Sequence, residues 1–275
     1  MYTVDELNDR LIDLAFSEDI GDGDHTTLCC IPEDAMGKSR LLIKEEGILA
    51  GMRIAKEIFH RFDSTMQVEQ LMEDGAHVKP GDVPMIVTGK VRSLLQTERL
   101  MLNVMQRMSG IATMTNKYVE RLKGTNTRVL DTRKTTPGMR MLDNATAWFC
   151  FKLVVDLLKD NHIDFAGGIA NALDRCAAYQ KEKGLNLKVE IECRSFDEIN
   201  QVMAHGGADR IMLDNFSVED TKKAVELIDH KFETESSGGI TYDTLRDYAE
   251  CGVDFISVGA LTHSVKGLDM SFKAC

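Results

Sequence analysis

Two short segments place cationic side chains just after predicted strands. Arg133 and Lys134 follow the run at 128–131, and Lys159 and His162 follow the apolar run at 154–158. A guanidinium binds carboxylate or phosphate through its planar fork, whereas an ammonium acts as a point charge. The segments therefore predict a site for a polyanionic ligand, with His162 explained equally well as a ligand-binding or a structural residue.

Carboxylates are expected near the same ligand. Glu190 and Glu192 alternate along one predicted strand and so face the same side of it, and Asp214 ends the next strand. A carboxylate inside a barrel is costly unless it lines the pocket, and Glu192, nearer the carboxyl end, is the better candidate. Glu192 and Asp214 predict either a shared Mg²⁺, which takes one or two carboxylates plus substrate phosphates, or hydrogen bonds to ribose hydroxyls.

Two glycine-containing loops follow the last predicted strands. The first includes Ser237, Gly238 and Gly239, and the second runs through Ser257, Val258 and Gly259. Glycine permits close approach of the main chain, and main-chain N–H groups before a helix favour phosphate. Two such loops on consecutive terminal strands match the phosphate site common in (β/α) barrels, although each alone is explained by an ordinary tight turn.

The elements that position these residues predict a parallel α/β fold, because short apolar runs alternate with helical patterns. Expected strands cover 128–131, 155–159, 188–192, 209–214, 232–236 and 253–258, and expected helices cover 169–183, 196–205, 218–229 and 242–251. The polar residues fall at or just beyond the carboxyl ends of strands, where a barrel assembles its active site. We therefore expect a barrel with one pocket for an anionic ligand.

The first hundred residues predict a small α+β unit instead. A helical pattern covers 4–16, and strands are expected at 39–44 and 83–88. Helical periodicity over 93–107 continues over 111–122 and predicts a long helix that leads out of this part. We place the domain boundary between residues 108 and 109, with an N-terminal domain at 1–108 and the barrel at 109–275.

Composition narrows the class of protein. The 275 residues carry a net charge of −11, which argues against a nucleic-acid-binding surface. No stretch approaches the roughly 18 apolar residues of a membrane span, and the amino terminus has no signal-peptide pattern. The seven cysteines show no CxxC spacing, which argues against zinc and a disulfide framework. A cytoplasmic enzyme with reduced thiols is expected.

The ordered motifs resemble the quinolinate phosphoribosyltransferase family over nearly the whole chain. The ordered set of motifs is specific to the family, although each motif alone is not. The motifs are 17–27, 98–99, Asn103, 109–113, 131–138, 159–162, 189–193, 213–215, 236–240 and 258–264. The resemblance implies an N-terminal α/β sandwich and a C-terminal open, TIM-like α/β barrel with fewer than eight strands. It also implies phosphoribosyl transfer from phosphoribosyl pyrophosphate to quinolinate with decarboxylation, in NAD biosynthesis.

The resemblance assigns roles to the candidate residues. It implies that Arg133, Lys134 and Lys159 bind the quinolinate carboxylates and the pyrophosphate, and that Glu192 and Asp214 face the ribose and Mg²⁺. Lys134, Lys159, Glu192 and Asp214 would form the catalytic set, and the loops at 237–239 and 257–259 would hold the 5-phosphate. It further implies a homodimer in which Arg99 reaches into the partner's site, with a higher oligomer left open.

One segment departs from the family pattern. Where the family has a glycine-rich loop ending in His-Arg, residues 144–156 are several residues shorter and contain no glycine, histidine or arginine, but hold the only tryptophan. Loss of one partner of a carboxylate clamp predicts poor or absent activity. The alternatives are an impaired or non-catalytic homologue, a related transferase for another acidic aromatic compound, or compensating frameshifts in the coding sequence.

Overall fold

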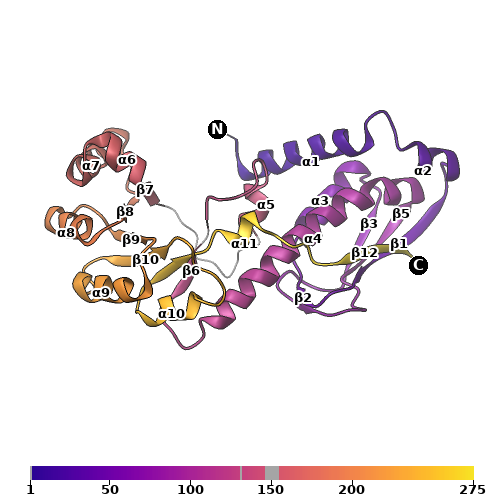
Figure 1. Ribbon diagram of the computed structural model, residues 1–275. Helices are drawn as coiled ribbons and strands as arrows, with labels where there is room; N and C mark the ends of the chain where they lie inside the picture. Colours follow the sequence, from indigo (N-terminus) through magenta and orange to yellow (C-terminus); the bar gives the residue numbers. More distant parts are fainter. Residues whose placement is uncertain (1, 131, 146–154) are drawn as a thin grey trace. The chain divides into compact units, whose positions relative to one another are not determined.

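The computed structural model describes residues 2–130, 132–145 and 155–275, and these form two compact units (Figure 1). The first unit contains residues 1–116, 133–148 and 261–275, and the second contains 117–132 and 149–260. The chain therefore returns to its first unit twice, once after residue 132 and once at its carboxyl terminus. The segment that departs from the family pattern lies largely, at 146–154, outside the described residues.

The first unit is an α/β sandwich, as predicted. Its main sheet is antiparallel with the order β12-β1-β5-β3, and a second pair joins β2 to β4. Its core contains fully buried Leu41, Phe59 and Met101. The elements of this unit are α1 (Val4–Ile20), α2 (His25–Cys30), β1 (Met36–Ile43), β2 (Gly47–Ile48), α3 (Met52–Phe62), β3 (Gln67–Gln70), β4 (His77–Val78), β5 (Met85–Lys90), most of α4 (Val91–Arg121), α5 (Arg140–Ala145), most of α11 (Ala260–His263) and β12 (Met270–Ala274).

The last strand, β12, lies in the sheet of the N-terminal strands. It pairs antiparallel with β1 and brings Phe272 opposite Leu41. Along β12, Met270 and Phe272 are buried whereas Lys273 is exposed. This alternation is a period-two signal in the sequence, although no strand was predicted there.

Helix α4 is continuous over its 31 residues, which confirms the predicted long helix and bridges the gap at 108–110 between its two periodic stretches. Ser109 and Gly110 lie in the gap between those two stretches. In the structure Gly110 lies against the main chain of residues 266–267, and a Cβ there would lie 3.1 Å from the Gly267 Cα. The Ser109 hydroxyl accepts a hydrogen bond of 2.9 Å from the Ala50 N–H. The two residues therefore serve close packing within an unbroken helix.

The second unit contains a six-stranded parallel sheet with the order β6-β11-β10-β9-β8-β7. The alternation of strands and helices predicted from the sequence is confirmed, and β6 and β7 are the two ends of this strand order, as expected of an open barrel with fewer than eight strands. The elements are β6 (Arg128–Leu130), β7 (Val155–Leu158), α6 (Asp160–Ala166), α7 (Ile169–Lys183), β8 (Lys188–Cys193), α8 (Phe196–His205), β9 (Arg210–Asp214), α9 (Val218–Ile228), β10 (Glu233–Ser237), α10 (Leu245–Glu250) and β11 (Phe255–Ser257).

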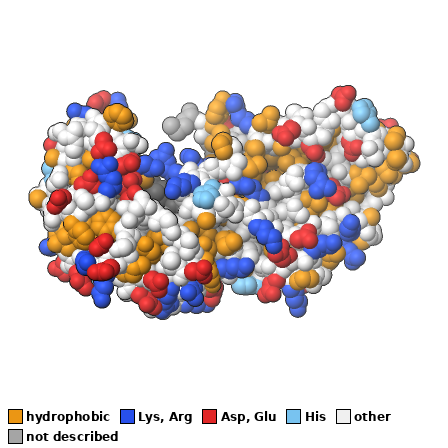
Figure 2. Space-filling view, in the orientation of Figure 1, with side chains coloured by type: hydrophobic (Ala, Val, Ile, Leu, Met, Phe, Trp, Pro, Cys, Tyr) orange, Lys and Arg blue, Asp and Glu red, His pale blue; other side chains and the backbone are white. Residues whose placement is uncertain are grey.

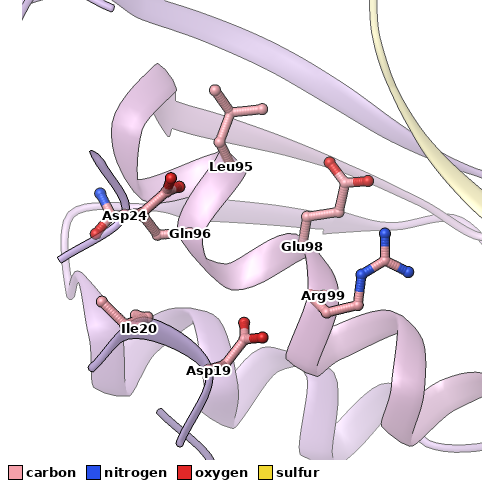
Figure 3. Close-up of a pocket in the computed structure, with 7 residues that line it drawn as sticks. All are labelled: Asp19, Ile20, Asp24, Leu95, Gln96, Glu98 and Arg99. Atoms are coloured by element: carbon pink, nitrogen blue, oxygen red, sulfur yellow. The ribbon is translucent and has the colours of Figure 1, made fainter. Parts of the chain in front are cut away.

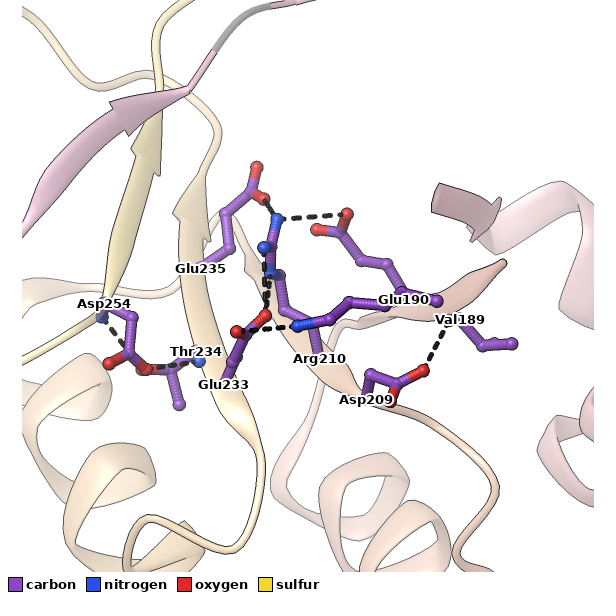
Figure 4. A network of polar contacts seen from close by, with 9 residues as sticks. Val189, Glu190, Asp209, Arg210, Glu233, Thr234, Glu235 and Asp254 are labelled. Carbon is purple, nitrogen blue, oxygen red and sulfur yellow. Dashed lines mark hydrogen bonds and ion pairs between the residues drawn. The ribbon is translucent and has the colours of Figure 1, made fainter. Parts of the chain in front are cut away.

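One face of this sheet carries a buried charged network (Figure 4). Register places Glu190 on β8 and Glu233 on β10 beside Arg210 of β9. The Arg210 guanidinium lies 3.0 Å from Glu233, 3.5 Å from Glu235 and 3.6 Å from Glu190. It also lies 4.0 Å from the centre of the Phe255 ring. Burial and the neighbouring Glu235 carboxyl raise the pKa of Glu190 to about 10, so Glu190 is protonated at neutral pH.

Lys and Arg side chains are interspersed with Asp and Glu on the face shown in Figure 2. Within the described part of the chain, no helix is both long enough and apolar enough to cross a bilayer.

Candidate functional site

The carboxyl edge of the parallel sheet brings together candidates from neighbouring strands of the second unit. Asp214, the last residue of β9, lies in register with Ser237, the last residue of β10. Glu192 lies one residue before the end of β8, Lys159 follows β7, and Ser257 ends β11. The parallel order of the strands therefore places residues far apart in sequence along one edge, as the predicted barrel requires.

Glu192 and Asp214 interact with each other and with Lys159. The Glu192 side chain is only 8% exposed. Its pKa is raised, first by burial and then by the negative charges of Asp214 and Asp160, and this effect is opposed by Lys159 and Arg194. The carboxyl edge is thus a place where carboxylates repel one another and where a cation or hydroxyl donors would be favourable.

Lys159 begins helix α6 and is half-buried. Its main-chain N–H donates a 3.0 Å hydrogen bond to Nδ1 of His162. His162 therefore caps the helix that follows Lys159, which favours the structural explanation of this histidine. The bond also fixes the main chain at the base of the Lys159 side chain.

The ends of β9 and β10 approach closely. Asn215 has a left-handed main chain with φ of 57°, and its N–H donates to the Ser237 carbonyl at 2.9 Å. Gly238 has φ of 92°, and a Cβ there would lie 2.9 Å from the Asn215 main-chain nitrogen. The geometry therefore requires glycine at position 238. Gly239 has φ of 62° and open space around it.

The second predicted loop follows β11. Ser257 and Gly259 are half-buried, whereas Val258 is buried. Ser257 is in register with Leu130 of β6, so it too lies at the carboxyl edge of the sheet. The candidate phosphate loops thus come from neighbouring strands β10 and β11.

Arg133 and Lys134 lie in the first unit, on an exposed loop before α5. The Arg133 carbonyl accepts a hydrogen bond from the Thr135 N–H at 2.9 Å, and the Lys134 carbonyl accepts one from the Thr262 hydroxyl at 2.8 Å. The main chain of the cationic pair is therefore held, and both residues are exposed.

Arg99 lies on α4 and is exposed. It lines a cavity of about 300 Å³ in the first unit, together with Asp19 and Ile20 of α1, Asp24, and Leu95, Gln96 and Glu98 of α4 (Figure 3). The cavity has an acidic lining in which Arg99 is the cationic member. Arg99 is thus accessible on its own unit.

Sequence reasoning missed Arg194, which directly follows β8. Its guanidinium makes paired hydrogen bonds of 2.9 and 3.1 Å to Asp164 of α6, and a further bond of 2.8 Å to Glu198 of α8. These bonds connect the helix that begins after Lys159 with the end of the Glu192 strand. The sequence signal that could have identified Arg194 is an arginine at a strand end, directly before Ser195, which caps α8.

Among the described side chains, no group of three or more His, Cys, Asp or Glu is arranged to hold an ion. Glu192 and Asp214 do fit the smaller protein contribution expected for Mg²⁺, which substrate phosphates and water complete.

Comparison with known families gives matches to both parts of the chain. A model described as the C-terminal domain of quinolinate phosphoribosyl transferase matches residues 111–273, and one described as the N-terminal domain matches residues 24–109.

Relatives and solved structures agree with these matches. The chain is 40% identical over 287 residues to the chloroplastic nicotinate-nucleotide pyrophosphorylase (carboxylating) of Arabidopsis thaliana, covering 96% of the chain and 81% of the relative. It is 37% identical over 269 residues to a probable enzyme of the same name from Bacillus subtilis, covering 95% and 91%. The structure of the nicotinate-nucleotide pyrophosphorylase from Francisella tularensis matches with a TM-score of 0.92 and 36% identity, covering 100% of this chain and 98% of that one.

Proposed function

The chain belongs to the quinolinate phosphoribosyltransferase family, and from this membership we propose its reaction. It transfers the phosphoribosyl group of phosphoribosyl pyrophosphate to quinolinate and releases pyrophosphate and CO₂. The product is nicotinate mononucleotide, an intermediate of NAD biosynthesis. The observation that carries the proposal is the row of Lys159, Glu192, Asp214 and Ser237 along one sheet edge, on a fold that matches these enzymes over the whole chain.

The chemistry consists of one substitution and one elimination. The quinolinate ring nitrogen attacks the anomeric carbon as the bond to pyrophosphate breaks, through a ribosyl transition state with cationic character. The ring nitrogen is then positively charged. The bond to the 2-carboxylate breaks, CO₂ leaves, and the electron pair that remains on the ring carbon is stabilised beside that charge and then protonated. The protein mainly aligns two polyanions and neutralises their repulsion.

The acidic pair is proposed to face the ribose. Glu192 and Asp214 would accept hydrogen bonds from ribose hydroxyls, stabilise positive charge that develops at the anomeric carbon, and contribute ligands to Mg²⁺ directly or through those hydroxyls. Mg²⁺ would supply positive charge to the departing pyrophosphate. Support comes from the raised pKa of Glu192, since repulsion from Asp214 is relieved when a cation or hydroxyl donors bind.

The cationic residues are proposed to bind the negative groups. Lys159 would contact the pyrophosphate or a quinolinate carboxylate, and Arg133 and Lys134 would bind the carboxylates of quinolinate. Exposure of Arg133 and Lys134 on a loop whose main chain is held supports this role.

The two loops at the ends of β10 and β11 are proposed to hold the 5-phosphate. Ser237, Gly238 and Gly239 form the first, and Ser257, Val258 and Gly259 form the second. The close approach of Gly238 to Asn215 supports this proposal because it presents main-chain groups at the sheet edge.

A homodimer is also proposed, in which Arg99 acts in the site of the partner. Support comes from its exposure and from the cavity that it lines on its own unit.

A cytoplasmic location is proposed on the basis of reduced thiols. The adjacent Cys29 and Cys30, with sulfur atoms 3.5 Å apart, are free.

The comparisons do not favour the alternatives of an impaired or non-catalytic homologue or of a transferase for another acid. The matched relatives that cover nearly all of the chain are named for the quinolinate reaction or its product.

The test is a direct assay of the purified chain. With quinolinate, phosphoribosyl pyrophosphate and Mg²⁺, equal amounts of CO₂ and pyrophosphate should form, and both should depend on both substrates. Nicotinate in place of quinolinate should yield no CO₂. Pyrophosphate release with nicotinate but not with quinolinate would overturn the assignment.

A further inference from the structure

The loop that carries Arg133 and Lys134 is fixed by polar contacts from separate elements of its own unit. Its residues 133–139 precede α5, and Gly138 has φ of 79°. Contacts reach the loop from α4, from α5 and from α11. The three residues that make them, Arg107, Asp143 and Thr262, are not among those predicted from the sequence.

The first contact is a buried ion pair. Arg107 of α4 donates two hydrogen bonds to Asp143 of α5, with Nε to Oδ1 at 2.7 Å and Nη2 to Oδ2 at 2.9 Å. The Asp143 side chain is fully buried, and that of Arg107 is 22% exposed. A paired fork of this kind fixes both distance and orientation, and breaking it would leave a buried charge.

The pair extends to the loop through Thr136. The Arg107 Nη2 donates to the Thr136 hydroxyl at 2.9 Å, and the Thr136 N–H donates to Asp143 Oδ2 at 3.3 Å. Thr136 lies two residues after Lys134. The ion pair therefore fixes the carboxyl-terminal side of the cationic dipeptide.

The second contact comes from α11. The Thr262 hydroxyl donates to the Lys134 carbonyl at 2.8 Å, and the Thr262 carbonyl lies 3.5 Å from Arg107 Nη2. The Thr262 side chain is only 2% exposed. One hydroxyl thus connects the main chain of Lys134 to the same arginine that holds Thr136.

We infer that Arg107, Asp143 and Thr262 are positioning residues, which fix the Arg133–Lys134 loop so that its cations meet the carboxylates of the acidic substrate. This inference rests on the proposed function for the identity of the ligand. Ordering the loop before binding lowers the entropy lost on binding, so the network should act on affinity for quinolinate. The contacts are all to polar atoms of the loop, which distinguishes them from packing of the apolar core.

The test replaces the Thr262 hydroxyl. Thr262→Val keeps the shape of the side chain and removes the donor to Lys134, whereas Thr262→Ser retains that donor. Thr127→Val is the matched control, because the Thr127 hydroxyl is also buried and donates to a carbonyl, that of Val253, at 2.6 Å. Thr127 lies just before the amino end of β6, away from the candidate edge.

Two measurements separate positioning from a general loss of stability. Hydrogen exchange of residues 133–139 should become faster in Thr262→Val and stay unchanged in Thr262→Ser and Thr127→Val. The KM for quinolinate should rise about five- to tenfold in Thr262→Val alone, as the net value of one hydrogen bond predicts, with a smaller change in kcat. Thr127→Val should lower the melting temperature without changing KM.

The outcomes distinguish this inference from the function on which it rests. Unchanged exchange at 133–139 in Thr262→Val would refute the positioning role whatever the reaction is. Faster exchange with an unchanged KM would refute the link to affinity. Absence of CO₂ and pyrophosphate release by the unmodified chain would instead refute the proposed function.

Discussion

Replacing Glu190 by glutamine should change how stability depends on pH. Glu190 is fully buried and shares the single guanidinium of Arg210 with Glu233 and Glu235 (Figure 4). Lys188 also pairs with Glu233 at 3.0 Å, so two positive charges face three carboxylates. Burial and the neighbouring Glu235 carboxyl raise the pKa of Glu190, so Glu190 retains its proton. Glutamine has the shape of the protonated acid and stays neutral at every pH in the experiment.

The sign and size follow from the pKa of Glu190, which is raised from 4.5 to about 10. Between these values the folded chain binds a proton that the unfolded chain has lost, so the free energy of unfolding falls as pH rises. The stabilising contribution of Glu190 is complete below its unfolded pKa and is lost as pH rises toward the folded one. One proton corresponds to about 1.4 kcal/mol per pH unit, or about 3 kcal/mol between pH 6 and 8.

Urea denaturation of both proteins at pH 6, 7 and 8, followed by circular dichroism, checks this. The free energy of unfolding of Glu190→Gln, relative to the unmodified chain, should rise across the series by up to about 3 kcal/mol. Glu226→Gln removes an exposed carboxylate of α9 and should leave the slope unchanged. Parallel curves for Glu190→Gln and the unmodified chain would refute the buried, protonated state of Glu190.

Three further predictions concern the candidate site. Gly238→Ala should destabilise the chain by about 1–3 kcal/mol and raise the KM for phosphoribosyl pyrophosphate, because φ is positive and the Cβ would contact Asn215. Gly239→Ala is the control, because its φ is also positive but the space around it is open. Equal effects of the two substitutions in melting and kinetic assays would contradict the argument from close approach. Asp214→Asn should lower the pKa of Glu192, because it removes a neighbouring negative charge. If Glu192 acts in its ionised form, the acidic limb of the pH–rate profile should move to lower pH. A limb that does not move in the residual activity would show that Glu192 is not the group that titrates there. Arg99→Ala and Asp214→Asn chains should each retain only a small residual activity. When they are mixed and reassociated at random, about a quarter of the sites should regain full activity, because half of the dimers are hybrids with one intact site. No recovery in the pyrophosphate-release assay, despite hybrids detected by mass spectrometry, would contradict the action of Arg99 in the partner's site.

Much of the second unit could be predicted from the sequence. Strands and helices alternate at a short period, and the parallel pairing that follows puts all carboxyl ends on one edge. Asp214 and Ser237 could therefore be assigned to one edge before their register was known. The required glycine at 238 follows a strand in a Ser-Gly-Gly turn, which is a local signal.

Other features depend on contacts between residues far apart in the chain. The hydroxyl of Thr262 bonds a carbonyl 128 positions earlier, and Arg107 meets Asp143 across 36 positions. The partners lie on different elements, so the periodicity of a single helix or strand does not reveal these bonds. The need for glycine at position 110 of α4 likewise comes from the distant main chain at 266–267.

The sequence by itself determined the family, the reaction and the residue types at the strand ends, because these follow from ordered motifs and from local periodicity. Only the tertiary structure decided which groups share a charge and which hold a loop. The raised pKa of Glu192 and the protonated state of Glu190 arise from burial and from neighbours on adjacent strands. Those quantities depend on distance in space and on exclusion of water, and neither is written in the order of the residues.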